Sequence, residues 1–266
     1  MRVALITGAS SGIGREFALQ LYRSGEADFF YIIARRRQRL DMLASELDGK
    51  AKIIEADLSR REDIDRIAAI LADDKPSVRY LVNAAGYGKF GDWSEINDDD
   101  VCGMIDVNVK ALVLMTNAVI PYMERGGHII QMGSASCFTP LPSFNVYASS
   151  KAFVLHYTKA LKYELRDKKI SVTAFCPGWV DTEFLGVAKD KNDVRMPREM
   201  KPLLRADRVV RGALKAAKHG RVMYVTNSFT KLQHLLSKIL PDCILTKIYL
   251  GMLTKPKEKN GKEISK

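Results

Sequence analysis

The stretch Val3–Gly14, VALITGASSGIG, joins an apolar run to a loop that holds three glycines. Gly8 lets the chain turn, Gly12 leaves room for a ligand beside the backbone, and Gly14 lets a following helix pack close to a sheet. The start of that helix offers free N–H groups and a positive dipole end, which suit a phosphate. The spacing is G-x-x-x-G-x-G, which differs from the more common G-x-G-x-x-G. We therefore predict a strand, a phosphate-binding loop and a helix, with a purely structural turn as the alternative.

Short apolar runs alternate with longer amphipathic segments over the first 226 residues. The runs expected to be strands are 2–7, 28–34, 51–57, 78–86, 127–134, 170–178 and 221–226. The segments expected to be helices are about 13–23, 40–47, 64–71, 98–123 and 146–166, with one more near residue 209. Strict alternation predicts right-handed crossovers and a parallel sheet with both faces covered. We therefore expect residues 1–226 to form one α/β domain, with a doubly wound Rossmann-type sheet of about seven strands.

The composition is that of an ordinary globular chain, with 266 residues, 47% of them hydrophobic and 27% charged. Its four cysteines are widely spaced and include no C-x-x-C pair, so we expect neither a disulfide framework nor a metal site. The apolar run that follows the first two residues is too short for a secretion signal. No stretch reaches the roughly 18 apolar residues of a membrane span. These features favour the cytoplasm.

The second predicted strand ends in three consecutive arginines, Arg35, Arg36 and Arg37. A carboxylate at this place would accept a hydrogen bond from a ribose 2′-hydroxyl, whereas a guanidinium binds a 2′-phosphate. The arginines therefore favour NADP(H) over NAD(H), with Arg35 as the first choice for the contact; the alternative is a solvated, basic helix start. Asp57, after the third strand, is expected either to bind the adenine amino group or to cap the next helix.

Five further motifs follow the glycine loop in a fixed order. They are NAAG at 83–86, NV at 108–109, a serine at 134, YASSK at 147–151 and PG at 177–178. In this combination the chain resembles the short-chain dehydrogenase/reductase family, in its compact single-domain branch, over about residues 2–226. The resemblance implies an oxidoreductase that uses a nicotinamide dinucleotide.

The resemblance also implies a catalytic group, Asn108, Ser134, Tyr147 and Lys151. Tyr147 would give a proton to a carbonyl oxygen, or remove one from an alcohol. Lys151 lies one helical turn further on the same face, where its ammonium is expected to lower the pKa of Tyr147 and to bind the nicotinamide ribose. Ser134 would align the substrate oxygen, with Ser136 as the alternative. Asn108 would hold a water that links Lys151 to solvent.

The same resemblance extends to the cofactor. Asn83 is expected to stabilise the sheet through backbone bonds more than to touch the ligand, whereas the Val180 backbone and the Thr182 hydroxyl would meet the carboxamide. The complete set of expected cofactor residues is Gly8, Ser10, Ser11, Gly12, Ile13, Gly14, Arg35, Arg36, Asp57, Leu58, Asn83, Ala84, Ala85, Gly86, Tyr147, Lys151, Pro177, Gly178, Val180 and Thr182.

The residues expected around the substrate are largely apolar. They are Ser136, Phe138, Phe144, Trp179 and Phe184. Such a lining favours a hydrophobic ketone or acyl chain over a phosphorylated sugar. Residues 183–204 are too long for a tight connection and are expected to form a substrate lid. We therefore expect an NADP(H)-dependent enzyme that interconverts a carbonyl and a secondary alcohol; the alternative is a non-catalytic NADP-binding or redox-sensing module.

Residues 227–266 form a basic amphipathic extension. The whole chain has a net charge of +11, and this extension holds eight lysines and three acidic residues. Apolar residues recur at helical spacing on both sides of Pro241, which predicts a helical hairpin or a kinked helix. The extension is expected either to pack on the body or on another copy, in a homodimer or homotetramer, or to contact a membrane surface peripherally. No nucleic-acid-binding module is recognisable.

Overall fold

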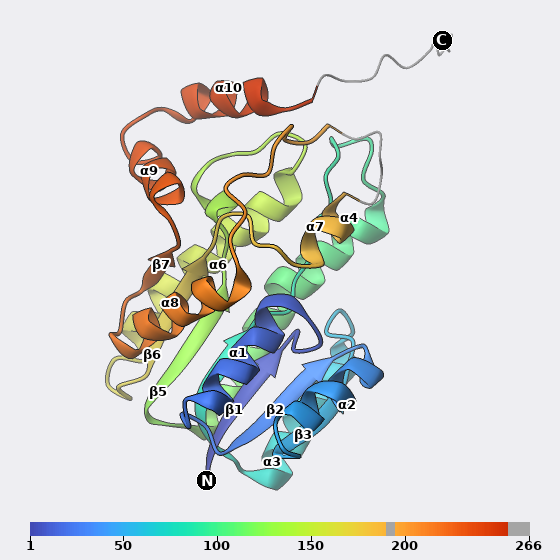
Figure 1. Cartoon of the computed structure of the whole chain (residues 1–266), viewed down its shortest axis with the longest axis vertical. Helices are drawn as coiled ribbons and strands as arrows, with labels where there is room; N and C mark the ends of the chain where they lie inside the picture. Colours follow the sequence, from blue (N-terminus) through green and yellow to red (C-terminus); the bar gives the residue numbers. More distant parts are fainter. Residues whose placement is uncertain (190–194, 255–266) are drawn as a thin grey trace.

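The computed structural model describes residues 1–189 and 195–254, and its strands form one parallel sheet with helices on both faces (Figure 1). The strands are β1 (Arg2–Thr7), β2 (Phe29–Ala34), β3 (Ala51–Glu55), β4 (Ser77–Asn83), β5 (Met123–Met132), β6 (Ser171–Cys176) and β7 (Met223–Val225). Their order is β3-β2-β1-β4-β5-β6-β7, and every pairing is parallel. The predicted doubly wound sheet is thus confirmed.

Helices cover the sheet in two layers. The helices are α1 (Gly12–Arg23), α2 (Arg37–Glu46), α3 (Arg61–Asp74), α4 (Asp98–Ile105), α5 (Leu112–Val119), α6 (Asn145–Glu164), α7 (Phe184–Ala188), α8 (Ala206–Lys218), α9 (Ser228–Leu236) and α10 (Asp242–Met252). Side chains alternate along β1, so that Ala4 and Ile6 face α1, α2 and α8, whereas Val3 and Leu5 face α3, α5 and α6. Two apolar cores therefore hold the sheet between the helix layers.

The order of the strands reverses between β1 and β4, and this reversal positions the site. The loop after β1 and residues 84–86 after β4 meet there, because the carboxyl ends of both strands lie at the same edge. Gly8 has a φ of +66°, and a Cβ on it would lie 2.8 Å from the backbone nitrogen of Ala85. The close approach of the loop after β1 to residues 84–86 therefore requires a glycine at position 8.

The long predicted helix over 98–123 is not a single α-helix. Between α4 and α5 the segment Asp106–Ala111 is π-helical, and a short 3-10 turn, Ile120–Tyr122, ends the path. By length and composition the whole helical segment Asp98–Tyr122 could cross a membrane. Met115 and Val119 are nevertheless fully buried against the sheet, as in the core helix of a globular domain.

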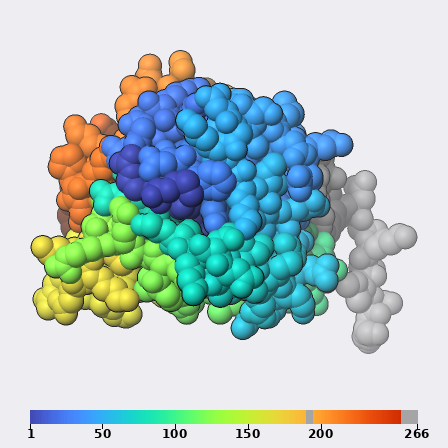
Figure 2. Space-filling model, turned by 90° about the horizontal axis from the view of Figure 1, so that it is seen from below, coloured from blue at the N-terminus to red at the C-terminus, as the bar shows by residue number. Residues whose placement is uncertain are grey.

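The C-terminal extension folds into α9 and α10, separated at Pro241 as the pattern predicts, and lies at the end of the molecule away from the N-terminus (Figure 1). The Gln233 amide donates to the Ala135 carbonyl at 3.3 Å, and Leu253 bridges to Pro197. The face that holds the N-terminus is formed mostly by the first half of the chain, blue to green in Figure 2. Residues 255–266, the rest of the extension, lie outside the described residues.

Candidate active site

A cavity of about 1120 Å³ opens at the carboxyl edge of the sheet. This volume suits a dinucleotide together with a small substrate. The sequence-predicted residues that line it are Gly8, Ser10, Ser11, Gly12, Ile13, Gly14, Arg35, Arg36, Asp57, Leu58, Ala84, Ala85, Gly86, Ser134, Ser136, Phe144, Tyr147, Lys151, Pro177, Gly178, Trp179, Val180, Thr182 and Phe184. Residues from the whole length of the described chain thus converge on one site.

The glycine loop fits a phosphate by its shape and its charge. A Cβ on Gly14 would lie 2.4 Å from the Gly8 carbonyl oxygen, so α1 can approach the loop only with glycine there. Ser11 begins α1 without a side-chain cap, and the first turn of the helix contains no acidic residue. The positive end of the helix is therefore available to an anion in the cavity.

The arginines after β2 do not all face the site. The Arg36 guanidinium donates to the Ser10 hydroxyl at 3.1 Å and to the Ser11 hydroxyl at 2.7 Å, and therefore lies directly against the glycine loop. Arg37 turns away and donates to Asp41 at 2.9 Å. Arg35, which the sequence favoured, lines the cavity without such a bond to the loop. Arg36 is therefore the arginine best placed to meet a ribose phosphate.

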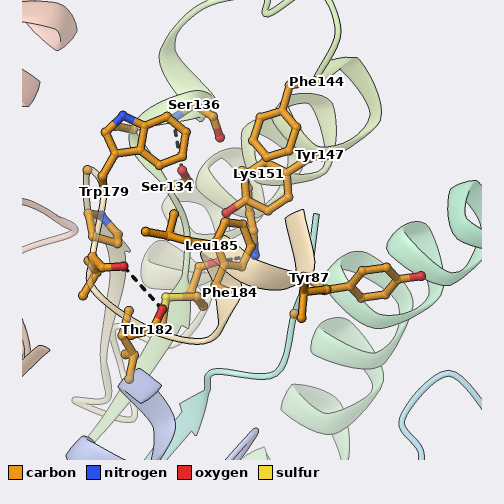
Figure 3. Close-up of a pocket in the computed structure, with 18 of the residues that line it drawn as sticks. Tyr87, Ser134, Ser136, Phe144, Tyr147, Lys151, Trp179, Thr182, Phe184 and Leu185 are labelled. Atoms are coloured by element: carbon orange, nitrogen blue, oxygen red, sulfur yellow. Dashed lines mark hydrogen bonds between the residues drawn. The ribbon is translucent and has the colours of Figure 1, made fainter. Parts of the chain in front are cut away.

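Tyr147 and Lys151 project from α6 into the inner end of the cavity, beside Ser134 from the end of β5 (Figure 3). Tyr147 is 7% exposed and Lys151 is 1% exposed. The Lys151 ammonium lies 5.5 Å from the centre of the Tyr147 ring and donates to the Met132 carbonyl at 2.9 Å. Because α6 places both side chains on one face, the i,i+4 spacing brings the ammonium beneath the phenol.

Asn108 lies in the π-helical segment, directly behind Gly86. Its amide nitrogen donates to the Tyr87 carbonyl at 2.9 Å, and its amide oxygen accepts from the Tyr87 backbone at 3.1 Å. A Cβ on Gly86 would lie 2.7 Å from that amide oxygen and 3.3 Å from the Lys151 nitrogen. Asn108 and Lys151 thus reach the same small space, in which only glycine fits.

Aromatic side chains form the wall beside Tyr147. Phe144 stacks on Tyr147 with ring centres 4.4 Å apart, and Phe90 stacks on Phe144 at 4.1 Å. Phe184 lies 5.4 Å from Tyr147, and Trp179 lies 6.3 Å from Phe90. This arrangement can hold an apolar group directly beside the phenol.

Comparison with known proteins agrees with this geometry. The sequence model of the short chain dehydrogenase family matches residues 2–193. The chain belongs to the short-chain dehydrogenase/reductase family. An uncharacterized oxidoreductase of Staphylococcus epidermidis is 34% identical over 183 residues, which are 68% of this chain and 79% of that protein.

Two solved structures, one of a dehydrogenase and one of a reductase, resemble the fold closely. A short-chain dehydrogenase from Sphingobium yanoikuyae in complex with NADPH is 28% identical, with a TM-score of 0.76 over 91% of this chain and 97% of that one. A 3-ketoacyl-(acyl-carrier-protein) reductase from Brucella melitensis complexed with NADH is 29% identical, with a TM-score of 0.70 over 85% and 94%. Such structures therefore hold either nicotinamide cofactor, with or without a 2′-phosphate.

Two residues expected in the site of this dehydrogenase/reductase lie elsewhere. Asn83 is 2% exposed, and its amide donates to the Thr116 hydroxyl at 2.9 Å and to the Gln131 side chain at 3.0 Å. Its backbone is paired in the sheet with Thr7 of β1 and Gln131 of β5, and its side chain adds bonds to α5 and β5. It does not line the cavity. Phe138 does not line the cavity and packs on His234, with ring centres 4.3 Å apart.

Asp57 lines the cavity, close to the start of α3. Its carboxylate accepts bonds from the Ser59 backbone at 3.0 Å and from the Ser59 hydroxyl at 2.8 Å, which form a local turn two residues before the helix. The N-cap of α3 is Arg60, so Asp57 does not have the capping role that the sequence left open. The turn holds the carboxylate at the cavity wall, where the adenine contact stays a prediction.

Burial sets the protonation of the two central groups of this dehydrogenase/reductase. It raises the pKa of Tyr147, which a hydrogen bond from Ser134 partly offsets. This is opposite to the lowering that we expected from Lys151, whose own pKa is lowered to about 8 by the same burial. The phenol is therefore protonated at neutral pH and can act as a proton donor.

Several lining residues escaped the sequence analysis. Leu232 and Leu236 of α9 and Leu245 and Ile248 of α10 line the cavity, so the extension helps to enclose it. Their helical spacing was visible in the sequence, but it does not indicate what the helices cover. In the predicted lid, Phe184 and Leu185 also line the cavity, whereas residues 190–194 lie outside the described residues.

Proposed function

We propose that this chain is an NADP(H)-dependent oxidoreductase that interconverts a carbonyl and a secondary alcohol on a hydrophobic substrate. The observation that carries the proposal is the convergence of Ser134, Tyr147 and Lys151 beside an aromatic wall, at the inner end of a cavity that begins at a phosphate-binding loop. The nicotinamide cofactor, when bound, supplies or accepts the hydride. The chain must therefore hold the substrate oxygen and exchange one proton with it.

Tyr147 is the residue suited to that proton exchange. In the reducing direction its phenol gives a proton to the oxygen as the carbonyl carbon gains a hydride, and in the oxidising direction the phenolate takes it back. The Ser134 hydroxyl aligns the same oxygen. The buried Lys151 ammonium lies close enough to stabilise the phenolate that remains after reduction.

The preference for NADP(H) rests on charge at the end of β2. Arg36 lies against the glycine loop, and Arg39 from the next turn reaches the same carboxylate as Arg36, that of Glu183. Two guanidiniums at this position suit a 2′-phosphate better than an uncharged ribose hydroxyl. Replacing Arg36 with Ala should therefore weaken NADP binding much more than NAD binding.

The test of the function is a panel of hydrophobic ketones and acyl carbonyls, assayed with NADPH and with NADH by loss of the reduced-cofactor absorbance. Tyr147→Phe should abolish turnover and leave NADPH binding within about twofold. Tyr163→Phe, at an exposed phenol on the same helix, is the matched control and should keep wild-type turnover. Equal turnover by the wild type and Tyr147→Phe would refute the catalytic role.

The alternative is a module that binds NADP without turning over a substrate. It predicts that NADPH stabilises the chain against heat in the wild type and in Tyr147→Phe alike, with no carbonyl in the panel reduced by either. The side chain of Ser136 favours an enzyme over a module that only binds NADP. It lines the cavity, and its buried hydroxyl has no hydrogen-bond partner among the described residues, so it is free to meet a substrate.

We further propose that the outer faces of α9 and α10 contact an anionic membrane surface. The exposed apolar residues on this surface outside the cavity lining are Leu235, Ile239 and Ile244. Four more, Phe229, Leu232, Ile248 and Met252, are exposed and also line the cavity. Exposed lysines, Lys231, Lys238 and Lys247, lie among them. Apolar contact combined with lysines suits acidic lipid. The same helices line the cavity, so a hydrophobic substrate would enter from the membrane side.

Sedimentation with vesicles tests the membrane contact. Vesicles of phosphatidylcholine with phosphatidylglycerol should bind the full chain more strongly than phosphatidylcholine alone. A Leu235→Ser, Ile239→Ser double variant, at exposed positions outside the cavity lining, should lose this binding, whereas Met42→Ser on α2 should keep it. If the double variant instead dissociates a dimer or tetramer in solution, the surface is an interface between copies.

A further inference from the structure

One carboxylate, that of Glu183, lies at the point where the cofactor phosphate is expected. Arg36 donates to it at 2.8 Å, and Arg39 donates to its other oxygen. Arg36 holds the hydroxyls of Ser10 and Ser11 in the glycine loop at the same time. Glu183 thus completes a chain of contacts from the segment after β6 to the loop after β1.

The two ion pairs keep the Glu183 carboxylate ionised and are exposed to solvent. The two arginines hold the pKa of Glu183 down to about 2, with Arg39 the larger cause, so the carboxylate is ionised at any physiological pH. The side chains of the three partners remain 44–46% exposed. Exposed partners can exchange one anion for another without opening a buried core. The two guanidiniums therefore already bind an anion, and it is one supplied by the chain itself.

We propose that Glu183 is a built-in competitor for the 2′-phosphate of NADP(H), and so a determinant of cofactor specificity. A phosphate that pairs with Arg36 and Arg39 must displace this carboxylate or accept its repulsion. A ribose with a free 2′-hydroxyl need do neither. Glu183 therefore weakens the binding of NADP(H) but not that of NAD(H). It thereby reduces the preference for NADP(H) that the arginines create. The inference rests on the proposed NADP(H) preference and deepens it.

The two neighbours of Glu183 in the chain, Thr182 and Phe184, lie at different parts of the site. On one side, Thr182 lies over the glycine loop, where a Cβ on Gly12 would be 3.2 Å from its Cβ. On the other side, Phe184 lies 5.4 Å from the Tyr147 ring. Glu183 therefore sits between a cofactor contact and a substrate contact.

Calorimetric titration of the full chain with adenosine 2′,5′-bisphosphate and with adenosine 5′-monophosphate isolates the competition, because these probes differ only in the 2′-phosphate. Glu183→Gln should bind the bisphosphate roughly three- to tenfold more tightly than the wild type, since exposed ion pairs are weak. Binding of the monophosphate should change by less than about twofold. Asp181→Asn, which removes an equal charge two residues away, is the matched control and should bind both probes as the wild type does.

The outcomes separate the inference from the proposed function. If Arg36→Ala does not weaken binding of the bisphosphate, the arginine site and the NADP(H) preference are both wrong. If Arg36→Ala weakens this binding but Glu183→Gln leaves it unchanged, only the competitor role of Glu183 is wrong. Weaker bisphosphate binding by Glu183→Gln would make Glu183 a supporting residue and overturn the inference. Equal tightening by Asp181→Asn would overturn it too, because net charge alone would then explain the effect.

Discussion

Lys151 carries a fully buried ammonium, and replacing it with Met should stabilise the fold while abolishing turnover. Burial lowers its pKa from 10.5 to about 8. That difference corresponds to about 3 kcal/mol of unfavourable free energy while the group is charged. The hydrogen bond to the Met132 carbonyl offsets about 1–2 kcal/mol of it. Lys151→Met should therefore raise the free energy of unfolding by about 1–2 kcal/mol at neutral pH.

The pH dependence gives the sharper test of the same reasoning. Below pH 8 Lys151 is protonated in both the folded and the unfolded chain, so the penalty is complete. Between pH 8 and 10.5 the folded chain releases the proton first, so wild-type stability rises relative to the variant. Urea unfolding of both proteins from pH 7 to pH 10 should show their difference change by roughly 2–3 kcal/mol in favour of the wild type.

Lys159→Met, on the exposed side of the same helix, is the control and should not alter the pH profile. A wild-type-to-Lys151→Met difference that stays constant from pH 7 to pH 10 would refute the buried, depressed ammonium. Loss of stability at every pH would show instead that the lysine contributes more through its hydrogen bond than its burial costs.

Three further changes test other parts of the structure. Burial lowers the pKa of His128 to about 4, so the free energy of unfolding should fall by about 3 kcal/mol as pH drops from 6.5 to 4, and His128→Phe should remove most of that slope in urea titrations. Gly14→Ala should weaken NADPH binding by at least about tenfold in calorimetry, because its Cβ would lie 2.4 Å from the Gly8 carbonyl, whereas Gly186→Ala, in open space, should bind normally. Asn83→Ala should cost about 2–3 kcal/mol in thermal unfolding because it leaves buried partners unpaired, yet the KM for cofactor should stay unchanged; a raised KM would return Asn83 to the cofactor site.

The residues that the sequence places correctly depend on short-range geometry. Tyr147 and Lys151 share a face because four residues make about one helical turn, and Gly8 lies at the sheet edge because it follows β1 directly. The order of strands and helices likewise follows from local periodicity. Such features require no knowledge of what packs against them.

The residues that the sequence misplaces depend on long-range packing. Whether Arg35 or Arg36 meets the glycine loop is decided by the direction in which the chain leaves β2, and Glu183 reaches Arg36 from 147 positions away. Phe90 joins the aromatic wall only because backbone bonds from Phe90 to Ala188 and from Gly91 to Ser143 hold its loop there. The direction of the Tyr147 pKa shift depends on how completely the site is enclosed, which no local pattern reveals.

The two helices of the C-terminal extension have different neighbours on their two sides, which constrains how this protein can diverge. The inner side of α10, with Leu245 and Tyr249, lines the cavity, and the outer side, with Ile244 and Lys247, is open to the surroundings. A substitution that shifts or tilts the helix alters both sides together. If the outer side binds a membrane as proposed, substrate range and membrane attachment depend on the same helix, and descendants that change one of them should carry compensating changes in the other.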